Sequence, residues 1–217
     1  MQKNIKYGII SNQVSGGIIM KVKNIKMYNI HKPNHHDELW VPGNIIHIDN
    51  NFRNDFLSRI PVKHNNSTSN AIANLESKLN YIDSFEFDSP EEGQAYVYNI
   101  INHLNQLKYV EREQALEEYR RTHCPNKLSR YNSIWVTDEK SLEYWKKLIE
   151  GEIFQVSLTG KLFKTYDQLM PSVDSFITYP QLVKASRKYW NPLFQKKESS
   201  KAEYLFQGDL KVLKKIK

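Results

Sequence analysis

Cysteine is almost absent from this chain, since Cys124 is the only one among 217 residues. A single thiol excludes an internal disulfide, and it excludes a structural zinc site built on several thiolates. No apolar run approaches the ~20 residues that a transmembrane helix needs. These absences predict a protein of the reducing cytoplasm with no membrane-spanning segment.

Glycine is also scarce, and the eight glycines never fall into a GxGxxG or GxxxxGK spacing. This argues against a Rossmann dehydrogenase and against a P-loop enzyme. Tyrosine and tryptophan are plentiful, with 13 and 4 copies. Each buries a flat ring and keeps a polar edge, which suits pockets that hold ring-shaped ligands. The length is enough for a single domain with a real core.

The first 20 residues differ from the rest of the chain. Lys3 and Lys6 are followed by polar residues rather than by an apolar core, which makes this stretch a poor signal peptide. Met20 is a candidate start of the native protein, and an ordinary glycine-containing linker around residues 16–17 is the alternative. We expect residues 1–20 to be an extension without chemistry and residues 21–217 to form one domain.

The positive charge is concentrated at the C-terminal end. The segment from 184 to 217 holds ten Lys or Arg and three Asp or Glu, so it accounts for the whole net charge of +7. A basic segment of this kind attracts polyanions such as nucleic acids. Tyr189, Trp190 and Phe194 lie among these charges and predict rings on which bases stack. An ordinary solvated surface is the alternative.

The apolar pattern predicts an α+β fold. Alternation predicts strands over 22–31, 45–48, 131–136 and 153–158, with another beginning over 161–163 and a closing strand or hairpin over 203–216. In the first strand, Tyr28 and Ile30 share one face, and Asn29 and His31 share the other. Helical spacing predicts helices from Pro90 to about 109, over 110–123, 139–149 and 180–190. Leu142, Trp145 and Leu148 are the expected inward positions of the third helix.

Two groups of reactive residues carry weaker signals. His123 and Cys124 are adjacent, and neighbours on a helix do not face one another, which argues against a thiol nucleophile. His31, His35, His36, Asp37 and Glu38 form the densest set of metal-ligand types. Pro33 interrupts the helix that would align two of these histidines, so we expect a solvated loop and no metal site.

Three short segments, at 28–31, 129–136 and 203–213, resemble the three motifs of the ADP-ribosyltransferase superfamily, and in particular a poorly characterised bacterial branch of it. Tyr28-Asn29-Ile30-His31 resembles the first motif, where a His often directly follows the Tyr and where Asn29 stands here. Ser129-Arg130-Tyr131-Asn132-Ser133 resembles the second motif, and Glu203 resembles the third. The similarity spans about residues 27–213.

The resemblance implies a split, mostly antiparallel β core around a cleft for NAD, with flanking helices. It implies that Glu203 is the catalytic residue, which stabilises an oxocarbenium-like ribose as nicotinamide leaves. Ser133 and either His31 or Asn29 would position NAD, and Arg130 would lie near the pyrophosphate. Tyr131, Tyr144 and Trp135 are candidates for stacking on the nicotinamide ring. NAD is then a substrate, and no metal is required.

The implied function is NAD-dependent mono-ADP-ribosylation of a macromolecule. The basic C-terminal segment favours single-stranded RNA over DNA, with protein as the other acceptor class. By analogy such a transferase acts as a toxin or an anti-phage effector, with an antitoxin protein as partner. One alternative is a nucleic-acid-binding protein without enzyme activity. Another is an NAD-using phosphotransferase that removes RNA 2′-phosphates, which would depend little on Glu203.

Overall fold

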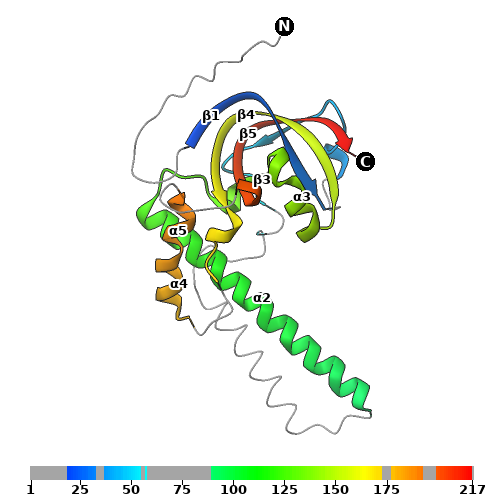
Figure 1. Cartoon of the computed structure of the whole chain (residues 1–217), viewed down its shortest axis with the longest axis vertical. Helices are drawn as coiled ribbons and strands as arrows, with labels where there is room; N and C mark the ends of the chain where they lie inside the picture. The colour runs from blue at the N-terminus through cyan, green and yellow to red at the C-terminus, as the bar shows by residue number, and fades with distance from the viewer. Residues whose placement is uncertain are drawn as a thin grey trace.

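The computed structural model describes residues 19–32, 37–54, 57, 89–172, 177–192 and 199–216. Its fold class is α+β, as the sequence predicts: a mostly antiparallel sheet is flanked by helices (Figure 1). None of the helices in these ranges is long and apolar enough to cross a membrane. Residues 1–18, most of the expected extension, lie outside the described residues.

The sheet is built from long, strongly curved strands. The described strands are β1 (Ile19–His31), β2 (Ile45–Ile48), β3 (Ile134–Val136), β4 (Glu152–Tyr166) and β5 (Ala202–Ile216). Their order is β1-β4-β5-β2, with β3 also paired to β5, and every one of these pairs is antiparallel. β4 is therefore the central strand between β1 and β5, and these three arch side by side in Figure 1.

The sheet closes on itself through one bridge. Tyr28 of β1 and Thr137, just after β3, exchange two backbone hydrogen bonds of 2.9 and 2.8 Å. Since β3 pairs β5, β5 pairs β4 and β4 pairs β1, the bridge completes a small barrel. A barrel of this kind has an inner face and an outer face, and the strands alternate between them.

Two glycines let β4 and β5 cross closely where the barrel bends. Gly160 and Gly208 are paired across these strands. A β-carbon on Gly208 would lie 2.3 Å from the backbone oxygen of Thr159, and its φ is +137°. Other residues cannot occupy this position without moving the backbone of the neighbouring strand.

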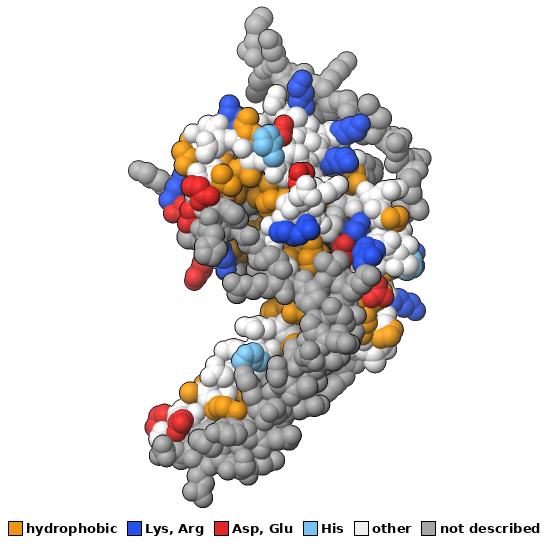
Figure 2. Space-filling view, turned by 180° about the vertical axis from the view of Figure 1, so that it is seen from behind, with side chains coloured by type: hydrophobic (Ala, Val, Ile, Leu, Met, Phe, Trp, Pro, Cys, Tyr) orange, Lys and Arg blue, Asp and Glu red, His pale blue; other side chains and the backbone are white. Residues whose placement is uncertain are grey.

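The helices cluster beside the barrel. They are α2 (Pro90–His123), α3 (Glu139–Leu148), α4 (Tyr179–Ala185) and α5 (Arg187–Trp190). Short 3-10 turns lie at η1 (Asp37–Leu39), η2 (Arg130–Asn132), η3 (Asp167–Leu169) and η5 (Ser199–Lys201). The C-terminal half of α2 packs beside the barrel, whereas its N-terminal half projects away from it, with hydrophobic side chains exposed along it (Figures 1 and 2).

Capping residues fix the starts of two helices where the sequence predicts them. The Ser89 hydroxyl accepts a hydrogen bond from Glu92 N at 3.2 Å, and Pro90 occupies the first turn of α2. The Asp138 carboxylate accepts from Ser141 N at 2.9 Å and caps α3. The expected break near Tyr109 is wrong, because α2 continues unbroken to His123. Leu148, expected to point inward, is exposed at the end of α3.

Three other boundaries differ from the prediction. The expected strand over 131–136 begins only at Ile134, because residues 130–132 form a 3-10 turn capped by the Ser129 hydroxyl. The strands expected over 153–158 and 161–163 are one strand, since Gly160 lies within β4 rather than ending it. The expected helix over 180–190 is divided at Ser186 into α4 and α5.

Two hydrophobic cores follow from the closed sheet. The larger core fills the barrel with inward side chains such as Met27, Phe154 and Phe206. The second core lies between the outer face and the helices, and it joins Phe163 and Leu205 of the strands to residues of α2 and α5. The outer face is thus covered near the start of β5, and the candidate site lies in this covered region.

Candidate functional site

Glu203 is the second residue of β5 and belongs to the outer face. It is on the same side of the strand as Leu205, which packs in the second core, and it pairs with Thr165 of β4. The helices α2 and α5 cover this position, so Glu203 is only 5% exposed. A buried carboxylate needs a cation or hydrogen-bond donors, and the neighbouring elements supply both.

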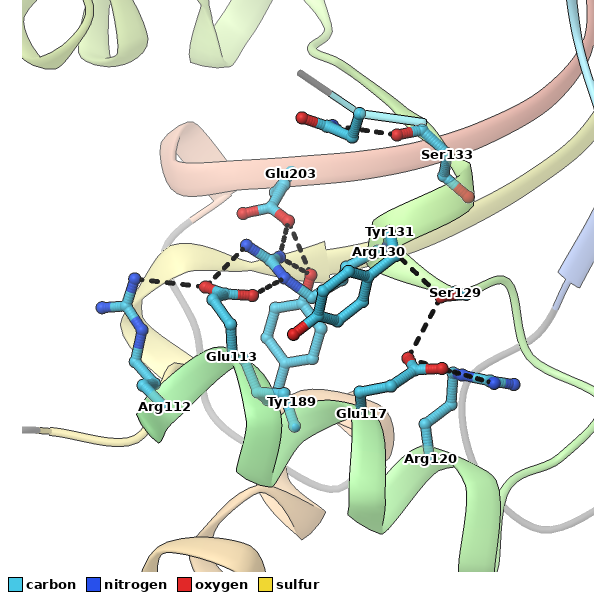
Figure 3. A network of polar contacts seen from close by, with 12 residues as sticks. Arg112, Glu113, Glu117, Arg120, Ser129, Arg130, Tyr131, Ser133, Tyr189 and Glu203 are labelled. Atoms are coloured by element: carbon cyan, nitrogen blue, oxygen red, sulfur yellow. Dashed lines mark hydrogen bonds and ion pairs between the residues drawn. The ribbon is translucent and has the colours of Figure 1, made fainter. Parts of the chain in front are cut away.

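Arg130 is the centre of the cluster around Glu203 (Figure 3). It lies in η2 and forms a buried ion pair with Glu203, 73 residues away in the sequence. Its Nε donates to Glu113 Oε2 at 2.7 Å, and its Nη2 is 3.3 Å from Glu113 Oε1. This is a forked pair with a carboxylate of α2, a geometry that suits the planar guanidinium.

Aromatic side chains enclose the guanidinium. The Cζ of Arg130 lies 4.7 Å from the ring centre of Trp135 and 5.1 Å from that of Tyr189. Tyr189 also accepts a hydrogen bond from Arg130 and donates its own to Glu203 Oε1 at 2.6 Å. The result is a closely packed arrangement in which Arg130 is only 3% exposed.

The formal charges of the cluster balance, but its central cation is shared by both carboxylates. Arg130 faces two carboxylates, those of Glu113 and Glu203, and Arg112 approaches Glu113 at 3.3 Å from the partly exposed rim. Burial alone would lower the pKa of Arg130, but Glu113 and then Glu203 more than offset it, so the pKa lies well above its usual value. Burial, with a smaller contribution from Glu203, raises the pKa of Tyr189 well above its usual range, so its phenol stays protonated.

The two oxygens of Glu203 are not equivalent. Oε1 accepts from both Arg130 and Tyr189. Within the described part of the chain, Oε2 accepts no hydrogen bond, and it is not among the fully enclosed polar atoms that lack a partner. The carboxylate is therefore held by one oxygen, while the other is free and accounts for part of the small exposed fraction of Glu203.

A second ion pair anchors the loop that carries Arg130. Glu117, one helical turn after Glu113, binds Arg120 through two contacts of 2.7 and 2.9 Å and accepts a hydrogen bond from Ser129 at 3.1 Å. Arg120 in turn donates to the carbonyl of Lys127 at 2.9 Å. Consequently, α2 fixes both the start of η2 and the guanidinium that η2 presents.

Asn29 and His31 lie on the inner face of the barrel, away from Glu203. Both are 7% exposed, on the side of β1 that also carries Met27. The Nε2 atom of His31 bonds Asp37 at 2.7 Å, and its ring stacks on Trp40 at 4.6 Å. The predicted alternation of β1 is confirmed, but the structure does not bring the first-motif residues next to Glu203.

Trp135 connects the two faces. The Asn29 amide donates to the Trp135 carbonyl at 2.8 Å, while the Trp135 indole covers Arg130 on the outer face. Among the described residues, the Tyr28–Thr137 bridge is the only backbone pairing that joins β1 to the β3 segment. The side chain of Asn29 thus replaces the backbone pairing at the point where the two strands separate.

Ser133 lies immediately before β3, as the C-cap of η2. It is fully buried, and its Oγ has no hydrogen-bond partner; the Oδ1 atom of Asn29 is in the same state. The backbone carbonyl of Ser133 accepts from Asn54 at 3.0 Å, so the residue is firmly placed. Buried polar atoms without partners are rare in folded proteins, so these two are candidates for ligand contacts.

Several expected roles do not fit these positions. Tyr189 and Trp190 are fully buried in the second core, so the prediction that they stack on bases is wrong, and Phe194 lies outside the described residues. The Tyr131 ring points toward α2 and is 5% exposed (Figure 3), whereas Tyr144 lies on α3 and donates to Asp167.

No group of three metal-ligand side chains occurs among the residues that the structure places. His35 and His36 lie outside those residues. His123 stacks on Tyr119 one turn earlier, at 4.4 Å, which fits the expectation that it does not activate Cys124.

Sequence reasoning missed Glu113 and gave Tyr189 the wrong environment. Glu113 and Glu117 lie four residues apart on α2, on the side that buries Leu116. Two acids on the buried stripe of a helix are a signal for buried cations, and this signal was available in the sequence. The role of Tyr189 could not be predicted from the sequence, because it depends on how α5 folds over β5.

Comparison with known proteins places this chain in a family. No curated protein matches the sequence. A family model described as "Protein of unknown function (DUF2441)" matches residues 27–217. The match covers β1 from Met27, the candidate cluster and all of β5. Because it spans most of the sequence, the chain belongs to the DUF2441 family.

Proposed function

We propose that this protein is an NAD-dependent mono-ADP-ribosyltransferase with an ADP-ribosyltransferase-like core. The observation that carries the proposal is the buried ion pair between Arg130 and Glu203. These residues stand in the two segments that resemble the second and third motifs, 73 positions apart. The pair fixes one oxygen of Glu203 and leaves the other free. A carboxylate that contacts the ribose of NAD needs such a free oxygen.

Glu203 has the properties needed at the reacting centre. Loss of nicotinamide from NAD builds positive charge on the ribose C1′ and ring oxygen, and a nearby carboxylate stabilises it. Oε1 is occupied by Arg130 and Tyr189, so Oε2 would accept the ribose 2′-hydroxyl. A carboxylate held in advance does not have to reorganise during the reaction, which increases its effect.

The separation of β1 from β3 supports a cleft of the split type. Asn29 Oδ1, on β1, and Ser133 Oγ, immediately before β3, are buried acceptors without partners. A carboxamide such as that of nicotinamide supplies N–H donors that would satisfy such atoms. In this proposal Asn29 is the first-motif residue, since His31 is already bonded to Asp37 and stacked on Trp40.

Arg130 has a different role in this proposal from the one first expected. Its described partners are Glu113, Glu203, Tyr189 and the ring of Trp135, so four of its five N–H donors are used inside a buried cluster and not on a pyrophosphate. We therefore assign Arg130 to holding Glu203. Trp135 is half-buried beside this pair, and it is the candidate among the three expected stacking residues that best fits a nicotinamide contact.

The test combines labelled NAD with total cell extract and follows nicotinamide release and macromolecular label. We expect nicotinamide release and labelled macromolecules for the wild type. We expect neither product for Glu203→Gln, and circular dichroism should show that this variant is folded. Ser133→Ala removes a hydroxyl that makes no hydrogen bond, so its stability should be unchanged or higher. A raised KM for NAD in this variant would then report a lost ligand contact.

The matched control is Ser157→Ala, which makes the same change on a half-exposed position of β4 far along the strand from Thr165. Its KM for NAD, measured by nicotinamide release, should equal that of the wild type. Absence of nicotinamide release from the wild type, together with no shift of the melting temperature by millimolar NAD, would contradict the proposal. Retention of full activity by Glu203→Gln would instead favour the RNA 2′-phosphotransferase.

A further inference from the structure

We propose that the outer face of β1, β4 and β5 binds the phosphodiester backbone of a nucleic acid. Its defining side chains are six exposed lysines, here named the lysine face. They are Lys21, Lys23, Lys26, Lys161, Lys211 and Lys214. The binding itself is independent of enzyme activity; that the bound nucleic acid is the acceptor rests on the proposed function.

Strand register places these lysines on one continuous surface. Lys26 is opposite Ser157, which is opposite Lys211, so one row crosses all three strands. A second row joins Lys21, Lys161 and Gln207 in the same way. Neighbouring strands are about 4.8 Å apart, so Lys26 and Lys211 start about 10 Å from each other. Figure 2 shows Lys and Arg side chains spread over the barrel end of the molecule.

The charge on this face is unbalanced and unpaired. Among the exposed outward positions of these strands, Asp209 is the acidic residue, and it is hydrogen-bonded to His47 at 2.7 Å. None of the six lysines forms an ion pair within the described residues. An ammonium group without a protein partner is free to bind an anion, and several together attract a polyanion strongly.

The remaining side chains favour a sugar-phosphate backbone over an acidic protein. Between the lysines lie hydroxyl and amide groups that are half-buried, and these are typical partners of phosphate and sugar oxygens. They are Gln155, Ser157, Thr159 and Gln207. The exposed outward positions of these strands carry no Phe or Trp, and Tyr28 is half-buried. The face therefore suits contacts that do not depend on base sequence.

The lysine face leads toward the candidate site. Along β5, the outward residues Lys211, Asp209, Gln207, Leu205 and Glu203 follow one another at every second position. The exposed part ends at Gln207, where the covering by helices begins. Lys211 and Glu203 are eight residues apart, about 26 Å along an extended strand. A strand of nucleic acid on this face would thus lie within a few nucleotides of Glu203.

The experiment measures fluorescence anisotropy of a labelled 20-nucleotide oligouridylate without NAD, from 50 to 400 mM salt. Wild type and Glu203→Gln should bind equally, because the lysine face does not include the catalytic position. A single-stranded DNA of the same length identifies any preference for the ribose. An oligoglutamate peptide of equal charge serves as the competing polyanion and should not displace the RNA.

The decisive variant is Lys26→Gln with Lys211→Gln. Each phosphate contact on a single strand contributes about 0.7 to the slope of log K against log salt, so its loss costs roughly fivefold in affinity at 0.1 M. The double variant should therefore bind roughly 25-fold more weakly, with a slope shallower by about 1.4. The matched control is Lys108→Gln with Lys188→Gln, two exposed lysines of α2 and α5, which should bind like the wild type.

Equal weakening by both double variants, or displacement by oligoglutamate, would overturn the proposal in favour of nonspecific attraction. No measurable binding by the wild type at 50 mM salt would overturn it as well. Failure of the proposed function is recognised separately, since RNA binding with no nicotinamide release identifies a nucleic-acid-binding protein without transferase activity.

Discussion

Replacing Arg130 with methionine tests whether the buried cluster depends on its single central cation. Arg130 is 3% exposed, and its partners Glu113 and Glu203 are 1% and 6% exposed at their side chains. The variant Arg130→Met keeps much of the volume but leaves Glu203 as a buried carboxylate without a cation. Glu113 retains its contact with Arg112 at 3.3 Å. The free energy of unfolding should therefore fall mainly because of Glu203.

The expected loss is about 3–5 kcal/mol, the cost typical of removing one partner of a buried ion pair. For a protein of this size each kcal/mol corresponds to about 2–4 °C, so the melting temperature should fall by about 6–20 °C. Adding Glu203→Gln to Arg130→Met removes the unpaired charge and should recover most of this loss. Replacing a buried ion pair by neutral groups of similar volume is often close to neutral.

Urea denaturation followed by tryptophan fluorescence measures these differences. The control is Arg121→Met, an exposed residue of the same helix, for which we expect a change within about 0.5 kcal/mol. The reasoning fails if Arg130→Met lies within about 1 kcal/mol of the wild type, or if the double variant is no more stable than the single one.

Two further predictions concern Lys127 and Gly208. Burial lowers the pKa of Lys127 from 10.5 to about 8, so between these values the unfolded state binds more protons and the free energy of unfolding rises with pH. Urea denaturation at pH 7.5 and 9.5 should show that the free energy of unfolding of the wild type, relative to that of Lys127→Met, increases with pH. A difference that does not depend on pH would contradict the lowered pKa of Lys127. Gly208→Ala should destabilise by more than about 2 kcal/mol, because the added carbon meets the Thr159 backbone oxygen at 2.3 Å. Gly43→Ala, with open space around it and φ of +99°, should cost only about 1 kcal/mol in the same assay.

The sequence by itself determined the class of the fold and the ends of several elements. Alternating residues over 22–31 set which side of β1 faces the core, and Ser89 and Asp138 set the starts of α2 and α3 by capping. These features are local, because a cap or a period involves residues within a few positions of one another. The same locality explains the errors at Tyr109 and Gly160, where the structure continues an element that the local pattern ended.

Tertiary structure alone decided which candidate residues meet. Closure of the barrel through Tyr28 and Thr137 puts Asn29 and Glu203 on opposite faces, although their motifs lie on strands of one sheet. Folding of α5 over β5 buries Tyr189 against Arg130 instead of exposing it to bases. Such contacts join residues far apart in the chain, and their geometry follows from strand order and register. Local sequence patterns do not contain that information.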